Sequence, residues 1–353
     1  MKRVSLAICD SNRLYCERLG EYLRNNLKLS FDITSFTDTQ KLLEYLKNDE
    51  VSLLIISEKE FDNISQRTEV TNNVEAGDAN EYHLMMRRIK NTIIVCNDEG
   101  QNRSSDENIS YVSRLLPASE IVRQVIRICT ESPEDFEGLS PKKSGKRCRV
   151  LGLYTPIPGC GQSLMSMNLG EVLSEEGRSI LISFECFSPL SVLFDEEGSE
   201  DLMDLFYHAE CNPESFSLHL ERMKITKNGL DLIKPAMTPM QIREIDPGKV
   251  KELIRLLIEE AGYENVVLDI TTLPEGFPDI LAMCDVIYTI EGQGSADQRR
   301  ISLYNQTILQ SGYEQILEKT VKMSPPERGG REALKRSARE LVKKGLEVTG
   351  LGA

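Results

Sequence analysis

The strongest indication of fold lies in one segment, Tyr154-Thr155-Pro156-Ile157-Pro158-Gly159-Cys160-Gly161-Gln162-Ser163. It follows an apolar, strand-like run from Arg149 to Tyr154 and precedes a helical pattern from Ser163 to Ser174. A glycine-rich loop in this position lets backbone N–H groups turn towards a phosphate, and the N-terminus of the helix adds a positive potential. The segment therefore predicts an α/β domain with a loop of the phosphate-binding type.

The rest of the second half continues the alternation of strand and helix. Further strands are expected at Ser179 to Phe184, Leu230 to Ile233, Asn265 to Ile270, Asp285 to Ile290 and Thr320 to Met323. Helices are expected between them at Pro247 to Ala261 and Ala296 to Gln310. Such alternation is typical of a parallel sheet that is covered by helices.

The first half has the same rhythm. Its expected strands are Val4 to Cys9, Phe31 to Phe36, Val51 to Ile56, Thr92 to Cys96 and Ile109 to Val112. Its expected helices are Asn12 to Asn26, Thr39 to Lys47 and Ala118 to Cys129. Five strands in this rhythm fit a flavodoxin-like fold. The stretch from Ser57 to Asn91 is polar in its middle and receives no assignment.

A stretch rich in Pro, Gly, Ser and mixed charge separates the two halves, as a linker does. We therefore predict a domain over residues 1–130, a linker over 131–147, a second domain over 148–324 and a C-terminal helix and tail over 325–353. The predicted fold class is α/β, with two doubly wound parallel-sheet domains.

Composition excludes several classes of protein. No apolar run approaches the roughly 20 residues that span a bilayer, and the basic start reaches Asp10 too soon for a signal peptide, so we expect a cytosolic protein. The net charge of −14 opposes a phosphate backbone, which disfavours nucleic acid as a partner. Nine cysteines without a Cys-x-x-Cys pair, and only three histidines, indicate reduced thiols and no zinc site.

The glycine-rich loop resembles that of the MinD/ParA-type P-loop ATPases, whose pattern is Lys-Gly-Gly-x-Gly-Lys-Ser/Thr. The matching positions are Gly159, Gly161, Ser163 and, in the next turns, Asn168-Leu169-Gly170. Later runs resemble the same superfamily: Gly262 to Ile270, Phe277 to Leu281 and Cys284 to Ile290. The resemblance implies a MinD-like P-loop NTPase fold for the second domain.

Three loop positions depart from that pattern: Ile157 replaces the first lysine, Pro158 the first glycine and Gln162 the Walker lysine. Charge-assisted contacts of the Walker lysine's kind are worth about 1.5–3 kcal/mol, and Gln162 can donate a hydrogen bond but not a charge. The family's first lysine reaches the partner's nucleotide across a dimer, which Ile157 cannot do. Pro158 also removes one backbone donor.

The acidic residues of the family are partly lost as well. Aspartates are replaced by Ser183 and Glu185, whereas Asp269 remains at the end of a strand and can orient magnesium through water. The resemblance thus implies a nucleotide site formed by Gly159, Cys160, Gly161, Gln162, Ser163, Glu185 and Asp269, with Ser163 and Asp269 at the metal. Binding of ATP and Mg is expected to be weakened.

The first half resembles a response-regulator receiver, with Cys9-Asp10 in the place of the acidic pair that holds magnesium. The acceptor aspartate is missing, because the third strand runs into Ser57-Glu58, and the receiver's lysine would fall near Arg114. A serine does not replace a carboxylate that accepts phosphoryl beside magnesium. We expect a packing module rather than a phosphorylation switch, with Asp10 and Glu58 as ordinary surface acids.

A receiver-like unit followed by a MinD-like unit is similar to the TadZ/CpaE family, which places tight-adherence (Flp) pilus machinery in the cell. The resemblance implies a non-catalytic scaffold or localisation factor, acting as a homodimer with the pilus secretion ATPase and inner-membrane platform proteins. It implies a cytoplasmic location, at the inner face of the cell membrane or at the cell pole. Two alternatives stay open: a weak ATPase that uses Ser163, Glu185 and Asp269, and a signalling receiver, which Ser57 disfavours.

The segment from Arg328 to Glu347 carries seven basic residues and three acids. Its apolar residues Leu334, Ala338, Leu341, Val342 and Gly345 recur at helical spacing, which predicts an amphipathic helix. MinD proteins touch membrane through such a helix, but the stripe here is narrow and lacks Trp and Phe, so membrane contact is expected to be weak. We favour packing of the stripe on the second domain or on a partner.

Overall fold

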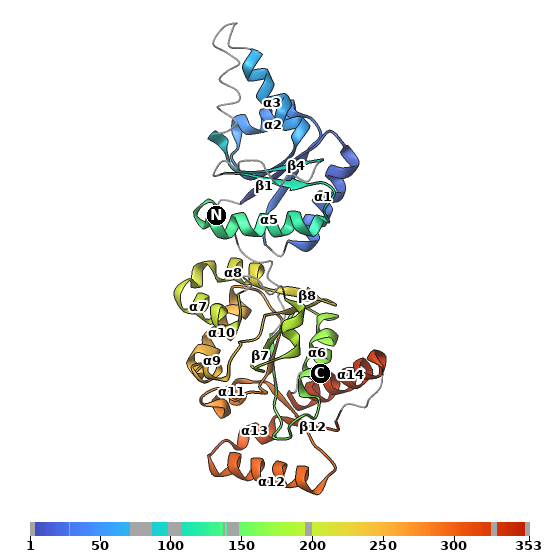
Figure 1. The fold of residues 1–353 in the computed structure, drawn as a ribbon, viewed down its shortest axis with the longest axis vertical. Helices are drawn as coiled ribbons and strands as arrows, with labels where there is room; N and C mark the ends of the chain where they lie inside the picture. Colours follow the sequence, from blue (N-terminus) through green and yellow to red (C-terminus); the bar gives the residue numbers. More distant parts are fainter. Residues whose placement is uncertain are drawn as a thin grey trace. The chain divides into compact units, whose positions relative to one another are not determined.

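The computed structural model describes residues 4–27, 29–70, 87–97, 108–136, 138–139, 148–194, 200–325 and 330–349. The chain divides into two compact units, Met1–Lys142 and Lys143–Ala353. Both are built on parallel sheets with helices on their faces, which confirms the predicted α/β class (Figure 1). No helix in the described part of the chain has the length and apolar character of a membrane span.

The first unit has five parallel strands in the order β2-β1-β3-β4-β5, the flavodoxin-like order. Its elements are β1 Ser5–Cys9, α1 Arg13–Asn26, β2 Asp32–Phe36, α2 Thr39–Asn48, β3 Val51–Ser57, α3 Glu58–Val70, β4 Ile89–Cys96, β5 Ile109–Ser113 and α5 Ala118–Glu131. Helices α2 and α3 pack on one face of the sheet, and α1 lies against α5 on the other (Figure 1). Helix α3 falls in the stretch left unassigned, whose residues 71–86 lie outside the described residues.

The start of the predicted linker belongs to the first unit instead. Helix α5 continues to Glu131, and a 3₁₀ helix, η2, covers Pro133–Phe136. The ring of Phe136 is 2% exposed and packs edge to face on Phe31, with 6.2 Å between ring centroids. Burial of one aromatic ring therefore fixes a segment whose composition is otherwise that of a linker. Residues 140–147 lie outside the described part of the chain.

The second unit has a seven-stranded sheet in the order β12-β11-β6-β10-β7-β9-β8. Its strands are β6 Arg149–Leu153, β7 Ser179–Ser183, β8 Ile225–Lys227, β9 Leu230–Leu232, β10 Asn265–Asp269, β11 Val286–Ile290 and β12 Thr320–Met323. The short β8, for which no strand was predicted, pairs antiparallel with β9 at this edge of the otherwise parallel sheet. The reason is a tight Asn228-Gly229 turn, in which both residues have positive φ, as a two-residue hairpin requires.

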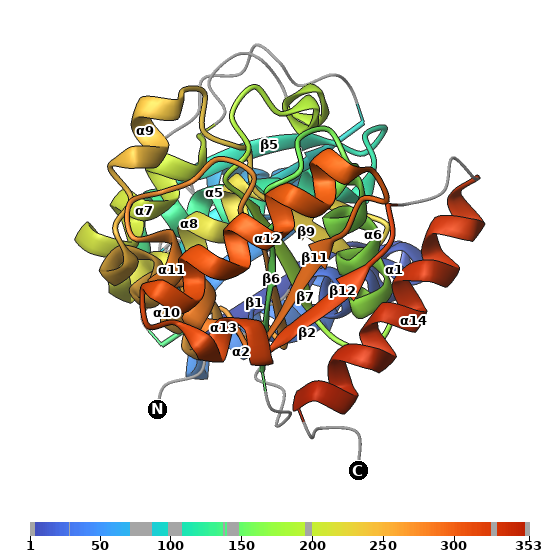
Figure 2. The same ribbon diagram turned by 90° about the horizontal axis from the view of Figure 1, so that it is seen from below.

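Helices cover both faces of this sheet. The helical elements are α6 Gln162–Ser174, η3 Pro189–Leu193, α7 Leu202–Cys211, η4 Pro213–Ser215, α8 Phe216–Met223, α9 Pro239–Arg243, α10 Pro247–Glu259, α11 Phe277–Met283, α12 Ser295–Gln310, α13 Glu314–Glu318 and α14 Arg331–Thr349. Helices α6 and α14 cover one face, and α7, α8, α10, α11 and α12 cover the other (Figure 2). Strands β7, β10 and β11 are buried at every residue, which explains their largely apolar sequences.

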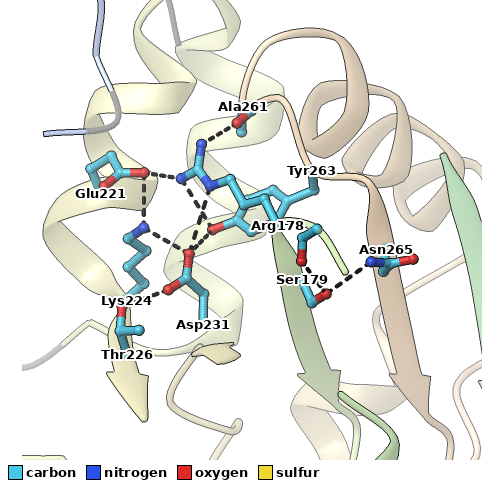
Figure 3. Close-up of polar contacts among 10 residues, drawn as sticks. Arg178, Ser179, Glu221, Lys224, Thr226, Asp231, Ala261, Tyr263 and Asn265 are labelled. Carbon is cyan, nitrogen blue, oxygen red and sulfur yellow. Dashed lines mark hydrogen bonds and ion pairs between the residues drawn. The ribbon is translucent and has the colours of Figure 1, made fainter. Parts of the chain in front are cut away.

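A buried cluster of charges lies at the start of β7 (Figure 3). The guanidinium of Arg178 contacts Glu221 of α8, and Lys224 joins Glu221 and Asp231 at N···O distances of 3.0 and 2.7 Å. The hydroxyl of Tyr263 donates to Asp231 at 2.7 Å, and Arg178 lies over the Tyr263 ring, 4.3 Å from its centroid. Two cations balance two anions here, so the cluster ties α8, β9 and the approach to β10 to the sheet.

Candidate functional site at the glycine-rich loop

The sheet brings the predicted site residues together at one edge. Strand β10 lies between β6 and β7, and the register sets Asp269 beside Leu153 on one side and Ser183 on the other. Because all three strands are parallel, their carboxyl ends meet at the same edge, where the glycine-rich loop leads from β6 into α6. This is the edge at which ligands bind in open parallel sheets.

The backbone of the loop has the geometry of an anion cradle. Gly159 and Gly161 have φ values of 65° and 90°, the left-handed region that favours glycine. A Cβ placed on Gly159 would meet no described atom within 4 Å, so the chain is open to solvent on that side of Gly159. Gly161 caps α6, and its carbonyl accepts the N–H of Met165 at 3.0 Å. The loop thus has left-handed glycines directly before a helix N-terminus, an arrangement that can accept a phosphate group.

The side chain of Gln162 points into the protein. It is 8% exposed, and its Nε2 lies 2.7 Å from Asp269 Oδ1, 3.1 Å from the Leu153 carbonyl and 3.1 Å from Thr271 Oγ1. Its Oε1 accepts the backbone N–H of Thr155 at 2.9 Å. Both ends of the amide are therefore engaged within the protein. The sequence predicted loss of charge at this position but not the direction of the side chain.

Asp269 is fully buried and has only uncharged partners. Its Oδ1 accepts from Gln162 and from Thr271 Oγ1, the latter at 2.7 Å, and its Oδ2 accepts from Ser183 Oγ at 3.3 Å. No cation in the described part of the chain forms an ion pair with it. Burial raises the pKa of Asp269, and the negative charge of Glu185 adds to the rise, against the hydrogen bonds from Gln162 and Thr271.

The remaining predicted residues occupy separate positions around this pair. Ser163 lies at the start of α6 with its Oγ 3.4 Å from Thr271 Oγ1, and Cys160 is half-buried in the loop. The carboxylate of Glu185 accepts the hydroxyl of Ser188 at 2.8 Å and so holds the turn after β7. Thr271 was missed by the sequence analysis, although its position two residues after Asp269 offered a signal.

The residues present fit a phosphate group but not the charge pattern of a P-loop ATPase. The loop amides and Ser163 would hold the anion, whereas Gln162 offers no charge and Ile157 is 7% exposed within the protein. Both oxygens of Asp269 accept hydrogen bonds from protein donors, Oδ1 from Gln162 and Oδ2 from Ser183. In the described ranges, no group of three or more His, Cys, Asp or Glu side chains could hold a metal ion.

The corresponding edge of the first unit carries a different arrangement. Asp10 is 3% exposed, forms an ion pair with Arg114 and accepts the N–H of Asn12 at 2.7 Å. Arg114 also lies over the ring of Tyr15, 4.3 Å from its centroid. The expectation that Asp10 is a surface acid is therefore wrong, because Arg114 neutralises it inside the fold. Ser57 is buried, and its Oγ accepts the N–H of Glu60 at 3.5 Å.

Comparison with known proteins gives likenesses of fold. No protein-family model and no curated protein matches the chain. A ParA family ATPase from Chlorobium tepidum is similar with a TM-score of 0.39 and 18% identity over 58% of this chain and 98% of its own. A plasmid partition protein from Borrelia burgdorferi gives 0.42 and 13% over 56% and 100%, and the cell division ATPase MinD of Pyrococcus furiosus gives 0.39 and 14% over 56% and 99%.

Proposed function

We propose that this chain is a non-catalytic relative of the MinD/ParA ATPases, a pseudo-ATPase that acts as a scaffold or localisation factor. The observation that carries the proposal is the inward direction of Gln162, whose amide is bonded to Asp269 and Thr155. Phosphoryl transfer depends almost wholly on positioning and on positive charge at the phosphates. A loop whose Walker position is uncharged and turned inward lacks that charge.

An apolar surface beside the loop supports a role in dimerisation and partner binding. We name it the apolar edge, and it consists of Leu164, Phe187, Val192, Met237, Met240 and Leu273, each at least 40% exposed. These residues follow β6, β7, β9 and β10, which are neighbours in the sheet and end at the same edge. Phe187 is 82% exposed and has a φ of 56°, a costly conformation for an aromatic residue. Exposed apolar groups that follow neighbouring strands at one edge of a sheet support a proposed interaction surface.

The proposed biological setting rests on the order of the two units. A receiver-like unit whose acidic edge is closed by Arg114, followed by a MinD-like unit, supports a TadZ/CpaE-type role in tight-adherence (Flp) pilus assembly. The proposed partners are a second copy of the chain, the pilus secretion ATPase and inner-membrane platform proteins. The proposed location is the cytoplasmic face of the membrane or the cell pole.

A second candidate, nucleotide binding without turnover, is favoured by the glycine-rich loop, which is open to solvent on one side of Gly159. Titration with a fluorescent ATP analogue, with and without magnesium, separates it from a protein that binds no nucleotide. ATP hydrolysis is expected to equal the background under both conditions. A rate clearly above background that disappears in Asp269→Ala would contradict the pseudo-ATPase.

Oligomeric state tests the apolar edge without reference to nucleotide. Sedimentation of the full chain is expected to give a dimer that Phe187→Asp and Val192→Asp weaken. Leu309→Asp, on the last turn of α12, is the matched control because Leu309 is 49% exposed and lies outside the apolar edge. A dimer that tolerates both edge variants would show that this surface does not hold the two copies together.

A further inference from the structure

Helix α14 lies along α6, the helix that begins at the glycine-rich loop (Figures 1 and 2). Ala338, Leu341 and Val342 of α14 are at most 5% exposed and belong to one apolar cluster with Leu169 and Leu173 of α6. The stripe predicted for the C-terminal helix therefore packs on its own domain. Helix α6 is buried along most of its length, and the apolar stripe of α14 covers part of it.

A line of ion pairs runs beside the apolar contact. Arg331 and Lys335 approach Glu171 at 3.0 and 3.4 Å, and Lys335 and Arg339 approach Glu175 at 3.7 and 3.1 Å. The three cations are four residues apart on α14, and the two acids are four residues apart on α6. Residues at this spacing share one face of a helix, so the two charged rows face each other along the contact.

Glu171 joins three segments of the unit. Its side chain is 8% exposed and pairs with Arg331 and Lys335. It also accepts a hydrogen bond at 2.8 Å from Nδ2 of Asn228, which lies in the turn between β8 and β9. Burial alone would raise the pKa of Glu171, but the hydrogen bonds from Asn228 and Arg331 and the charge of Lys335 lower it. The carboxylate is therefore held in its charged form between α6, α14 and the edge of the sheet.

The two ends of α6 are thus fixed by different contacts. Gln162 bonds to Asp269 at the loop end, and Glu171 and Glu175 bond to α14 near the other end. Between them, a Cβ on Gly170 would lie 2.8 Å from Leu230, so the helix already lies close against β9. A 13-residue helix is a stiff element about 20 Å long. A displacement of one end of α6 is therefore expected to displace the other end as well.

We propose that α14 is a charge-held clamp on α6. The ion pairs of α14 with Glu171 and Glu175 hold α6 in place, and their strength determines how well ordered the glycine-rich loop is. The clamp connects the C-terminal helix with the loop and with Leu164 of the apolar edge, which lies in the first turn of α6. It works whether or not the protein binds nucleotide or forms a dimer.

Hydrogen–deuterium exchange of the full chain tests the clamp. In Arg339→Gln and in Lys335→Gln, amide exchange is expected to rise roughly three- to tenfold in α14 and also in peptides covering the loop and the start of α6. Arg336→Gln is the matched control, because Arg336 is an exposed arginine on the same helix and forms no ion pair in the described part of the chain. It is expected to leave the loop unchanged.

A charge exchange identifies the cause. Glu175→Arg alone should loosen the loop, and the pair Glu175→Arg with Arg339→Glu should restore slow exchange. Faster exchange in α14 with an unchanged loop would overturn the proposal, because α14 would then be only a local cover. So would a loop that responds equally to Arg336→Gln and Arg339→Gln, or a charge exchange that restores nothing. None of these results depends on ATP turnover or on dimerisation, so the clamp and the proposed function can fail separately.

Discussion

Asp231 and Asp269 are both buried carboxylates of the second unit, but their partners are opposite in kind. Asp231 has Lys224 at 2.7 Å and Arg178 at 3.8 Å, with Tyr263 donating as well. Burial alone would raise the pKa of Asp231, but Lys224 lowers it, whereas the pKa of Asp269 is raised. Asp231 therefore has cationic partners within the fold, whereas Asp269, at the carboxyl end of β10, has uncharged donors among the described residues.

Removing each acid in turn should give the largest difference between them. Asp231→Asn leaves the cations of its cluster with one carboxylate, and breaking a buried ion pair costs about 3–5 kcal/mol in the free energy of unfolding. Urea denaturation followed by circular dichroism measures this loss. Asp269→Asn is the matched variant and should change stability by less than about 1 kcal/mol, because its partners are neutral and its charge is already disfavoured. Equal losses in the two variants would remove the distinction.

A third buried aspartate, Asp10 in the first unit, lies between these extremes, because one arginine neutralises it. Arg114→Met should leave the carboxylate without its cation and cost about 1–3 kcal/mol. Arg123→Met is the control, because Arg123 is an exposed arginine that pairs with Glu120 on the same helix, and the loss in unfolding free energy should be small.

Acetyl phosphate should form no acyl phosphate on the first unit, and a labile adduct seen by intact mass would contradict the packing-module interpretation.

Asp231 and Asp269 should change the free energy of unfolding over different ranges of pH. The lowered pKa of Asp231 gives stability that is complete above the unfolded value of about 3.9 and is lost as pH falls below it. The raised pKa of Asp269 has the opposite sign: its charged form costs stability, and that cost disappears as pH falls towards about 3.9 from above. Unfolding free energies of the wild type and both Asn variants should be measured from pH 3 to pH 7. The difference between wild type and Asp231→Asn should shrink below about pH 3.9, and the difference between wild type and Asp269→Asn should shrink as pH falls towards that value from above. Differences that shrink over the same range of pH would contradict the assigned shifts.

The sequence predicted the layout of the fold better than the interior of the site. Alternating apolar runs located most strands and their parallel arrangement, because strands buried on both faces need continuous apolar sequence. The hairpin of β8 and β9 was missed, although Asn228-Gly229 is a recognised two-residue turn signal. The direction of Gln162 could not be read, since it depends on Asp269 and Thr271, more than a hundred residues away. The same holds for the Asp10–Arg114 pair.

The smallest expected effect belongs to Gln162→Lys, which places a lysine where the proposed P-loop resemblance has the Walker lysine. The new ammonium group would lie beside Asp269, the nearest buried anion, where the amide of Gln162 already donates at 2.7 Å. A cation there lowers the pKa of Asp269 and offsets the cost of its burial, so thermal stability should rise slightly.

The charge of the introduced lysine would then be neutralised by Asp269 rather than lie beside a phosphate, and Ile157 and Ser183 are unchanged. ATP turnover should therefore stay at background, and affinity for a fluorescent ATP analogue should rise by less than about tenfold. Gln162→Met, with similar volume and no charge, is the control. Turnover clearly above background in Gln162→Lys but not in Gln162→Met would show that one charge separates this loop from a working ATPase. The inward direction of Gln162 would then not be the reason for the expected lack of ATP turnover.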